Sequence, residues 1–123
     1  MPPKHLVVLG GGFNGVELAS IYRALGSKVT LIEARETILA GWGSVVGGKV
    51  LEGLVQGGVT VKTGHPFTEE MLPSDCDMVL VAPGRSGNTK GLALEKIGIQ
   101  WDILFRLLRS CAYGVWSFQI FTR

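Results

Sequence analysis

The chain has 123 residues, of which 46% are hydrophobic and 18% charged, and its formal net charge is +2. These values indicate one globular domain with a modest core. The near-neutral charge, without a basic run, excludes proteins that bind nucleic acid through a strongly basic surface.

The first predicted strand leads into a glycine-rich turn. Residues 6–9 form an apolar run typical of a short buried strand, and the pattern G-x-G-x-x-G follows it at Gly10, Gly12 and Gly15. In a dinucleotide site the first glycine allows the tight turn, the second admits the pyrophosphate, and the third lets the helix pack on the strand. The helix N-terminus offers unpaired N–H groups to phosphate oxygens.

The first helix is predicted over residues 14–25, with one face against the sheet. That face is expected to carry Leu18, Tyr22 and Leu25, beside the small residues Gly15 and Ala19. Gly26 then acts as a C-terminal stop signal.

The second strand is predicted at residues 28–32, and Glu33 ends it, 23 positions after Gly10. A carboxylate at this place can accept hydrogen bonds from a ribose diol. A solvated strand end is the other interpretation of Glu33.

The middle of the chain continues the alternation of strands and helices. A loop at 33–43 precedes a helix predicted over 44–56, whose apolar stripe is Val46, Val50 and Leu54. The elements that follow are a strand at 59–62, a polar segment at 63–77, a strand at 78–82 and a turn-rich loop at 83–88. Since residues 78–82 are apolar throughout, we expect this strand in the centre of the sheet.

This order of elements predicts an α/β fold with a Rossmann-like, doubly wound and mostly parallel sheet, small and incomplete. Ligands of such sheets bind beyond the carboxyl ends of the strands. Both the glycine turn and the loop that contains Gly84 are expected there.

The last 23 residues differ in composition from the rest. Six of the ten aromatic residues lie in this tail, 101–123. Within 101–109 the apolar residues fit one helical face and the two arginines fit the other, and within 116–120 apolar and polar residues alternate as in a strand. Such a tail should expose an apolar patch or drive self-association. Its uncharged run at 110–122 is shorter than the ~20 residues of a membrane span, so none is expected.

Cysteine and histidine usage indicates no metal site. Cys76 and Cys111 form no C-x-x-C pair, and neither a zinc site nor a disulfide framework is suggested. His5 and His65 are isolated and are expected at the surface or in turns. The sequence shows no signal-peptide pattern, so an intracellular, cytoplasmic protein is the default expectation.

Three stretches together resemble the pyridine nucleotide–disulfide oxidoreductases, and in particular members of the dihydrolipoamide dehydrogenase type. LGGGFNGVELA at 9–19 looks like the turn of that family's NAD domain, and ALGSKVTLIE at 24–33 is similar to its second strand. VLVAPGRSGNT at 79–89, followed by LALEKIGI at 92–99, looks like its second NAD-domain signature. The resemblance covers residues 5–99, so residues 1–100 are assigned as an NAD-binding domain.

The resemblance implies a role for several residues in binding NAD. Glu17 would face the nicotinamide end, Glu33 would hold the adenosine ribose, and Gly84 would pass close to the nicotinamide ribose. Arg85 would brace that loop, although a solvated charge explains it equally well. The pyrophosphate would be carried by Gly10, Gly12, Phe13, Asn14 and Gly15.

The departures from the family limit what this chain does alone. No second glycine fingerprint precedes residue 5, and the C-x-x-x-x-C redox pair, the His-Glu acid–base pair and the flavin segments are absent from the sequence. We therefore expect NAD as the cofactor and FAD only in an intact family enzyme. No catalytic residue is assigned.

Three alternatives remain open. An FAD-binding domain shares the glycine turn but usually has Ala where Val16 stands and lacks Glu17. A methyltransferase that uses S-adenosylmethionine also has an acid after its second strand, but commonly another just before its glycines, where this chain has Val8 and Leu9. A non-catalytic dinucleotide-binding remnant is compatible with the preferred reading.

Overall fold

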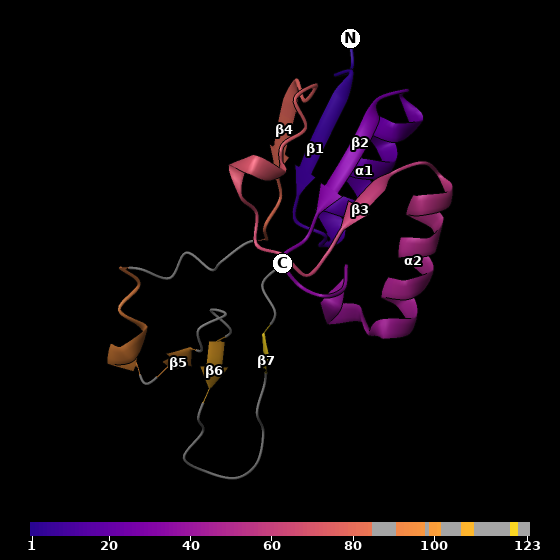
Figure 1. Ribbon diagram of the computed structural model, residues 1–123. Helices are drawn as coiled ribbons and strands as arrows, with labels where there is room; N and C mark the ends of the chain where they lie inside the picture. Colours follow the sequence, from indigo (N-terminus) through magenta and orange to yellow (C-terminus); the bar gives the residue numbers. More distant parts are fainter. Residues whose placement is uncertain (85–90, 98, 102–106, 110–118, 121–123) are drawn as a thin grey trace. The chain divides into compact units, whose positions relative to one another are not determined.

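The computed structural model describes residues 1–84, 91–97, 99–101, 107–109 and 119–120. The chain divides into two compact units, Met1–Gly84 and Arg85–Arg123, and each is treated by itself. The first unit holds all the elements that position the candidate site (Figure 1).

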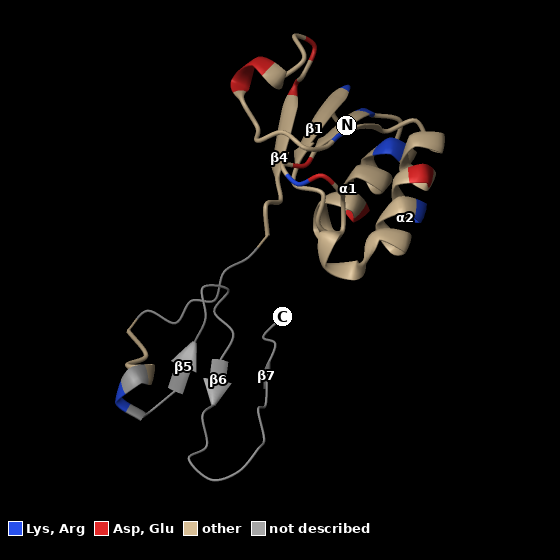
Figure 2. Cartoon of the chain, turned by 60° about the horizontal axis from the view of Figure 1, so that its bottom comes forward, with Lys and Arg blue, Asp and Glu red and all other residues tan. Residues whose placement is uncertain are grey.

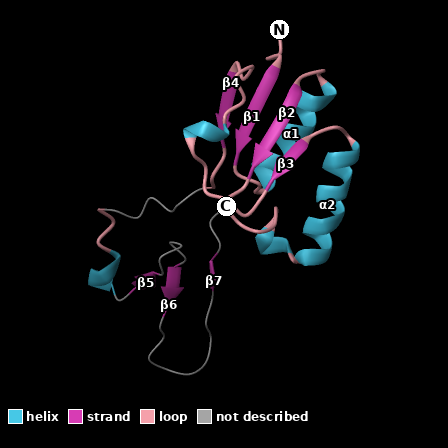
Figure 3. Ribbon diagram, viewed as in Figure 1, coloured by secondary structure: helices cyan, strands magenta, loops and turns pink. Residues whose placement is uncertain are grey.

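The first unit is an α/β structure with a four-stranded parallel sheet. Its strands are β1 (His5–Leu9), β2 (Lys28–Ile32), β3 (Thr60–Lys62) and β4 (Met78–Val81), in the order β3-β2-β1-β4. Helix α1 (Phe13–Ala24) connects β1 to β2, and α2 (Ser44–Gln56) connects β2 to β3 (Figure 3). The predicted α/β fold class is confirmed, with β2 and α2 at the predicted residues.

The core lies between the sheet and the two helices. Leu6 and Val8 of β1, Leu31 of β2, Ala19 of α1 and Leu54 of α2 form one buried cluster, and none is more than 6% exposed. The first four residues of strand β1 are buried, and the strand has a partner on either side, in register with Lys28–Ile32 and with Met78–Val81. The glycine turn therefore begins at the end of a strand that is held by hydrogen bonds on both sides.

The prediction that the fourth strand is central is wrong. Within the described residues β4 pairs only with β1 and lies at the edge of the sheet. Val79 and Val81 are 40% and 67% exposed. A continuous apolar run is compatible with a central strand and with an exposed apolar edge, so the pattern could not separate them.

Two details of the predicted helix faces are also wrong. Leu25 is the C-cap residue of α1 and is 59% exposed, because it lies beyond the last turn that faces the sheet. Val46 is 45% exposed, and Gly47 is buried in its place. A Cβ on Gly47 would lie 2.7 Å from the carbonyl oxygen of Ile38, so the close approach requires glycine.

His5 is a buried residue and not the surface histidine that was expected. Its Nδ1 lies 2.8 Å from Oδ1 of Asp75, and its Nε2 lies 3.0 Å from Oγ1 of Thr30. Nζ of Lys28 donates to Oδ2 of Asp75 at 2.9 Å. The hydrogen bonds from Lys28 and His5 lower the pKa of Asp75 to about 2. His65 is exposed, as predicted.

A second carboxylate joins this polar cluster. The backbone N–H groups of Lys4 and His5 both donate to Asp77 at 3.0 Å, which lowers the pKa of Asp77. Asp75 and Asp77 together fasten the connection between β3 and β4 to the amino end of the sheet.

The second unit contains the short 3₁₀ helix η3 (Leu94–Ile97) and a small antiparallel sheet of β5 (Ile99–Trp101), β6 (Leu107–Arg109) and β7 (Gln119–Ile120). The expectation of a helix over 101–109 is wrong at Leu107–Arg109, which pair with residues of β5 and β7. Residues 119 and 120 lie in a strand, as the alternation predicted, whereas 110–118 lie outside the described residues. Across the part of the chain that the structure describes, no helix has the length and apolar character for crossing a membrane.

Candidate functional site

The glycine turn joins β1 to α1 where the carboxyl ends of β1, β2 and β4 meet. Gly10 has a φ of +108°, which L side chains rarely adopt, and a Cβ there would overlap the carbonyl of Ala82. A Cβ on Gly15 would overlap the carbonyl oxygen of Gly10. The N–H of Gly10 donates to the carbonyl of Ile32 at 2.8 Å. Only glycine therefore fits at Gly10 and Gly15 without a shift of the neighbouring backbone.

Gly12 is open where the other two glycines are crowded. No atom lies within 4 Å of the place of its Cβ, and it is the N-cap of α1 with no side-chain hydrogen bond. The first N–H groups of a helix have no partner within the helix. The first turn of α1 carries no acidic residue, so its positive dipole end is not neutralised there. The backbone at Gly12 can thus be approached by an anion.

Glu33 is held at the end of β2 by backbone donors. Its Oε2 accepts the N–H of Gly11 at 2.5 Å, and its Oε1 accepts the N–H of Arg35 at 2.9 Å. The side chain is half-buried. Each oxygen keeps a further lone pair, so the carboxylate is oriented without being saturated.

Gly11 is a positioning residue that the sequence pattern did not single out, because it fills a variable place in G-x-G-x-x-G. Besides the bond to Glu33, its carbonyl accepts the N–H of Leu39 at 2.8 Å. A Cβ on Gly11 would lie 2.7 Å from Cγ2 of Ile38 and 3.0 Å from Cβ of Glu33. Gly11 therefore links the glycine turn to the loop that follows β2.

Two cavities flank Glu33. The larger has a volume of about 270 Å³. It is lined by Gly10, Ile32, Glu33, Ala34, Arg35, Phe67 and Pro83. Phe67 was not predicted as a site residue, since nothing in the sequence shows that the segment after β3 returns to this edge of the sheet.

The smaller cavity, of about 130 Å³, lies on the side of the glycine turn and is lined by Glu33, Arg35, Thr37 and Trp42 among others. Trp42 belongs to the 3₁₀ helix η1 (Ala40–Trp42). Its ring stacks on that of Phe13, with centroids 6.4 Å apart and planes at 27°. Both residues are 63% exposed, so an aromatic pair forms part of this wall.

The remaining predicted residues lie on the same edge of the sheet. Asn14 and Glu17 are exposed on the first turns of α1. The N–H of Ala82 donates to the carbonyl of Leu9 at 2.7 Å, which brings the loop after β4 beside the glycine turn. Gly84 in this loop is exposed and has a φ of +116°. Arg85 lies outside the described residues.

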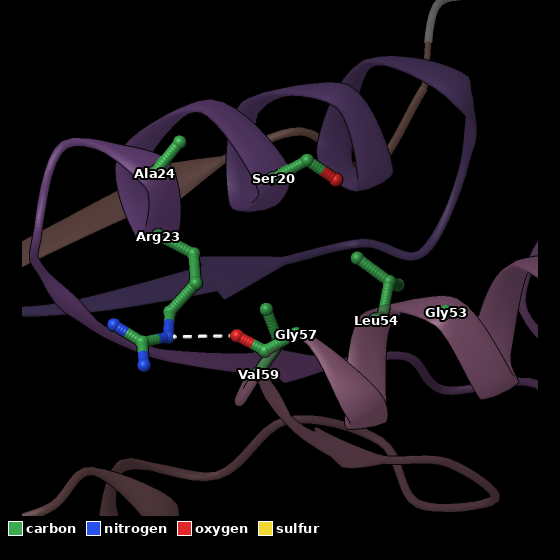
Figure 4. A pocket seen from close by; sticks show the side chains of 7 residues that line it. All are labelled: Ser20, Arg23, Ala24, Gly53, Leu54, Gly57 and Val59. Carbon is green, nitrogen blue, oxygen red and sulfur yellow. Dashed lines mark hydrogen bonds between the residues drawn. The ribbon is translucent and has the colours of Figure 1, made fainter.

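A third cavity lies at the other end of the sheet, where α1 and α2 end (Figure 4). Its volume is about 420 Å³, and Ser20, Arg23, Gly53 and Leu54 are among its lining residues. Nε of Arg23 donates to the carbonyl of Gly57 at 3.0 Å and so caps α2. Because this cavity is remote from the glycine turn, it forms no part of the site around Glu33.

No metal centre is found in the part of the chain that the structure describes, where no three His, Cys, Asp or Glu residues come together. Cys76 is a free thiol whose Sγ donates to the carbonyl of Met78 at 3.3 Å.

The parallel sheet with a glycine turn at its carboxyl end defines a Rossmann-like α/β domain. The sequence profile of the pyridine nucleotide-disulphide oxidoreductases matches residues 1–104, and the chain belongs to this family. The resemblance seen in the sequence is thereby confirmed at the level of the family.

Individual relatives agree with this assignment. The chain is 36% identical over 118 residues to dihydrolipoyl dehydrogenase 3 of Pseudomonas putida, covering 81% of this chain and 25% of that protein. It is 40% identical over 124 residues to dihydrolipoamide dehydrogenase of Chaetomium thermophilum, covering 81% and 24%. Glutathione reductase of Nostoc sp. is 33% identical over 112 residues, covering 79% and 24%.

Solved structures give the same result. The HOCl-induced flavoprotein disulfide reductase RclA of Escherichia coli superposes with a TM-score of 0.65 at 29% identity, covering 89% of this chain and 28% of that chain. The chain thus spans about a quarter of the length of the curated relatives it matches.

Proposed function

We propose that residues 1–84 bind NAD(H) as the nicotinamide-nucleotide domain of a pyridine nucleotide–disulfide oxidoreductase. The observation that carries this proposal is the carboxylate of Glu33, which backbone N–H groups hold at the end of β2, beside the open N-terminus of α1. A ribose that binds Glu33 would place its 5′-phosphate towards that helix end.

The pyrophosphate is proposed to bind the backbone of Gly12, Phe13 and Asn14. The fit is supported by the open space around Gly12 and by the lack of an acid in the first helical turn. Gly10 and Gly15 act indirectly, because they allow the turn and the close packing of α1.

The adenosine half is proposed to bind at Glu33, with the base in the cavity of about 270 Å³. Phe67, Ile32 and Ala34 offer that base an apolar wall. Glu33 accepts hydrogen bonds from the ribose hydroxyls. The nicotinamide half would then extend past Glu17 and Gly84.

Hydride exchange is the chemistry that NAD supplies when bound, and in a complete enzyme of this family a flavin would be its partner. The residues of this chain bind and orient the dinucleotide, and the cofactor carries the reaction. We assign no proton transfer to any side chain here. FAD is not proposed as a ligand of this chain, since Val16 and Glu17 depart from the pattern usual in FAD-binding domains.

Side-by-side titrations of the purified chain with NADH, NADPH, FAD and S-adenosylmethionine test the proposal. We expect saturable binding of NADH, weaker binding of NADPH, and no saturable binding of the other two. Preferential binding of FAD would move the chain to the flavin-binding class, and preferential binding of S-adenosylmethionine would refute the dinucleotide assignment.

A matched pair of variants ties the result to the site. Glu33→Ala should weaken NADH binding, whereas Glu36→Ala, an exposed acid in the same loop, should leave it unchanged. Equal effects of the two substitutions would contradict the role of Glu33.

A further inference from the structure

The cavity between the carboxyl-terminal ends of α1 and α2 has the size of a small-molecule site. Its volume of about 420 Å³ exceeds that of either cavity at Glu33 and falls within the roughly 300–1,000 Å³ of ligand pockets. Leu54 and Val59, which are 6% and 4% exposed, give it an apolar floor. Figure 4 shows the side chain of Arg23 reaching from α1 to Gly57 at the end of α2. The cavity therefore combines a buried apolar surface with one cation.

Arg23 keeps hydrogen-bond donors that the fold does not use. Only its Nε takes part in the cap of α2, through the bond of 3.0 Å to the carbonyl of Gly57. In the part of the chain that the structure describes, its two Nη groups donate to no acceptor and pair with no carboxylate. Because Nε is anchored, the planar guanidinium is already oriented before a ligand binds, and both Nη groups remain available to it.

Glycine keeps the α2 side of the cavity free of side chains. A Cβ on Gly53 would meet no atom within 4 Å, so packing does not require glycine at this position. Glycine inside a helix is destabilising relative to alanine. What Gly53 provides in exchange is an open wall, since it lines the cavity together with Gly57, one helical turn further on.

The charges around the cavity favour a ligand with a single negative charge. Arg23 is the only basic residue of α1, and Lys49, the only one of α2, pairs with Glu52 at 3.0 Å; Figure 2 shows how few charged residues the two helices carry. Both helices end at the cavity, where their carbonyl groups carry partial negative charge. A carboxylate matches one guanidinium through two parallel hydrogen bonds, whereas a phosphate with nearly two charges is repelled more strongly by the helix ends.

We propose that this cavity binds a small carboxylic acid with an apolar body. The carboxylate binds the Nη groups of Arg23, and the hydrocarbon part lies on Leu54 and Val59 beside Gly53. None of the residues that line this cavity lines either cavity at Glu33. The acid should therefore bind without displacing NADH, and its binding does not depend on the proposed dinucleotide site.

Amide NMR of the full chain during a titration with hexanoate tests the proposal. We expect saturable shifts at Ser20, Gly53 and Gly57 with a Kd of about 1 mM or lower, and none at Gly11 and Gly12. Acetate lacks the apolar body, hexanol lacks the charge and hexyl phosphate carries too much of it, so each should bind at least about tenfold more weakly. The absence of saturable hexanoate shifts overturns the proposal, and so does equal or tighter binding of hexanol or hexyl phosphate.

Matched variants separate the cavity from the structural role of Arg23. Gly53→Leu keeps the arginine and its cap but fills the cavity, so it should weaken hexanoate binding at least about tenfold without lowering the Tm. The control Gly48→Leu makes the same change at an α2 glycine that is equally open but lies outside the cavity, and should leave binding unchanged. Arg23→Met should weaken binding as much as Gly53→Leu, whereas Lys49→Met should not. Binding that survives Gly53→Leu or Arg23→Met, or that is lost equally in a control, contradicts the proposed site.

Discussion

Replacing Glu33 should remove the preference of this chain for NADH over NADPH. The carboxylate can accept a hydrogen bond from each ribose hydroxyl, and hydrogen bonds to charged groups contribute about 1.5–3 kcal/mol. In NADPH the 2′-hydroxyl is a phosphate, so the donor is lost and like charges come to about 4 Å, at a cost of about 1–4 kcal/mol.

The structure indicates that the free-energy preference for NADH over NADPH lies at the low end of these ranges. Both carboxylate oxygens already accept a backbone N–H, from Gly11 at 2.5 Å and from Arg35 at 2.9 Å, which offsets part of the negative charge. Arg35 is exposed, lines both flanking cavities and could approach a 2′-phosphate. We therefore expect a preference of at least about tenfold, or about 1.4 kcal/mol.

Titrations of nucleotide fluorescence at one fixed ionic strength measure this preference. Glu33→Ala should reduce the ratio of the two dissociation constants towards one, and Glu33→Arg should invert it. Glu33→Gln, which keeps an acceptor and removes the charge, should give an intermediate ratio. Equal affinities of the unmodified chain for NADH and NADPH would refute the reasoning about Glu33.

Four other predictions follow from particular contacts. Gly12→Ala should weaken NADH binding but leave the free energy of unfolding nearly unchanged, because a Cβ there meets nothing within 4 Å. Gly15→Ala should lower the free energy of unfolding by about 1–3 kcal/mol, because its Cβ would overlap the carbonyl of Gly10. Urea denaturation and NADH titration of both variants check this pair, and similar losses of stability would contradict it. Asp75, whose pKa falls from 3.8 to about 2, should contribute stability that is fully present above pH 4 and is lost as the pH falls through about 2. The stability difference between the unmodified chain and Asp75→Asn should therefore shrink over that window, and a difference independent of pH would argue against the pair with Lys28. Arg23→Ala should lower the free energy of unfolding by about 1 kcal/mol, because the carbonyl of Gly57 at the end of α2 loses its side-chain donor. An unchanged Tm would show that this cap is dispensable. The purified chain should carry no flavin, and stoichiometric flavin absorbance would contradict this expectation.

The local pattern of the sequence predicted the elements of the first unit well. The apolar runs and the glycine turn placed β1, α1 and β2, and α2 appeared at the predicted residues despite its internal glycines. These elements are predictable because their signals lie within a few residues of one another. The glycine pattern and Glu33 also led to the same edge of the sheet, since each sits at a strand end.

What could not be predicted depends on contacts between distant residues. Phe67 reaches the cavity beside Glu33 only because the connection after β3 folds back, and no local pattern encodes that path. His5 is buried because Asp75, 70 positions away, and Thr30 provide partners for its ring. The place of β4 at the sheet edge was missed for the same reason, since an apolar run does not show how many neighbours a strand has.

Amide NMR of the full chain during an NADH titration tests the central claim most directly. If the N-terminus of α1 binds the pyrophosphate and Glu33 the ribose, the largest shifts should occur at Gly11, Gly12, Phe13 and Asn14, with smaller ones at Phe67. The amides of Ser20, Gly53 and Gly57, which line the remote cavity, should not move. Saturable shifts at the remote cavity, with the glycine turn unperturbed, would contradict the account.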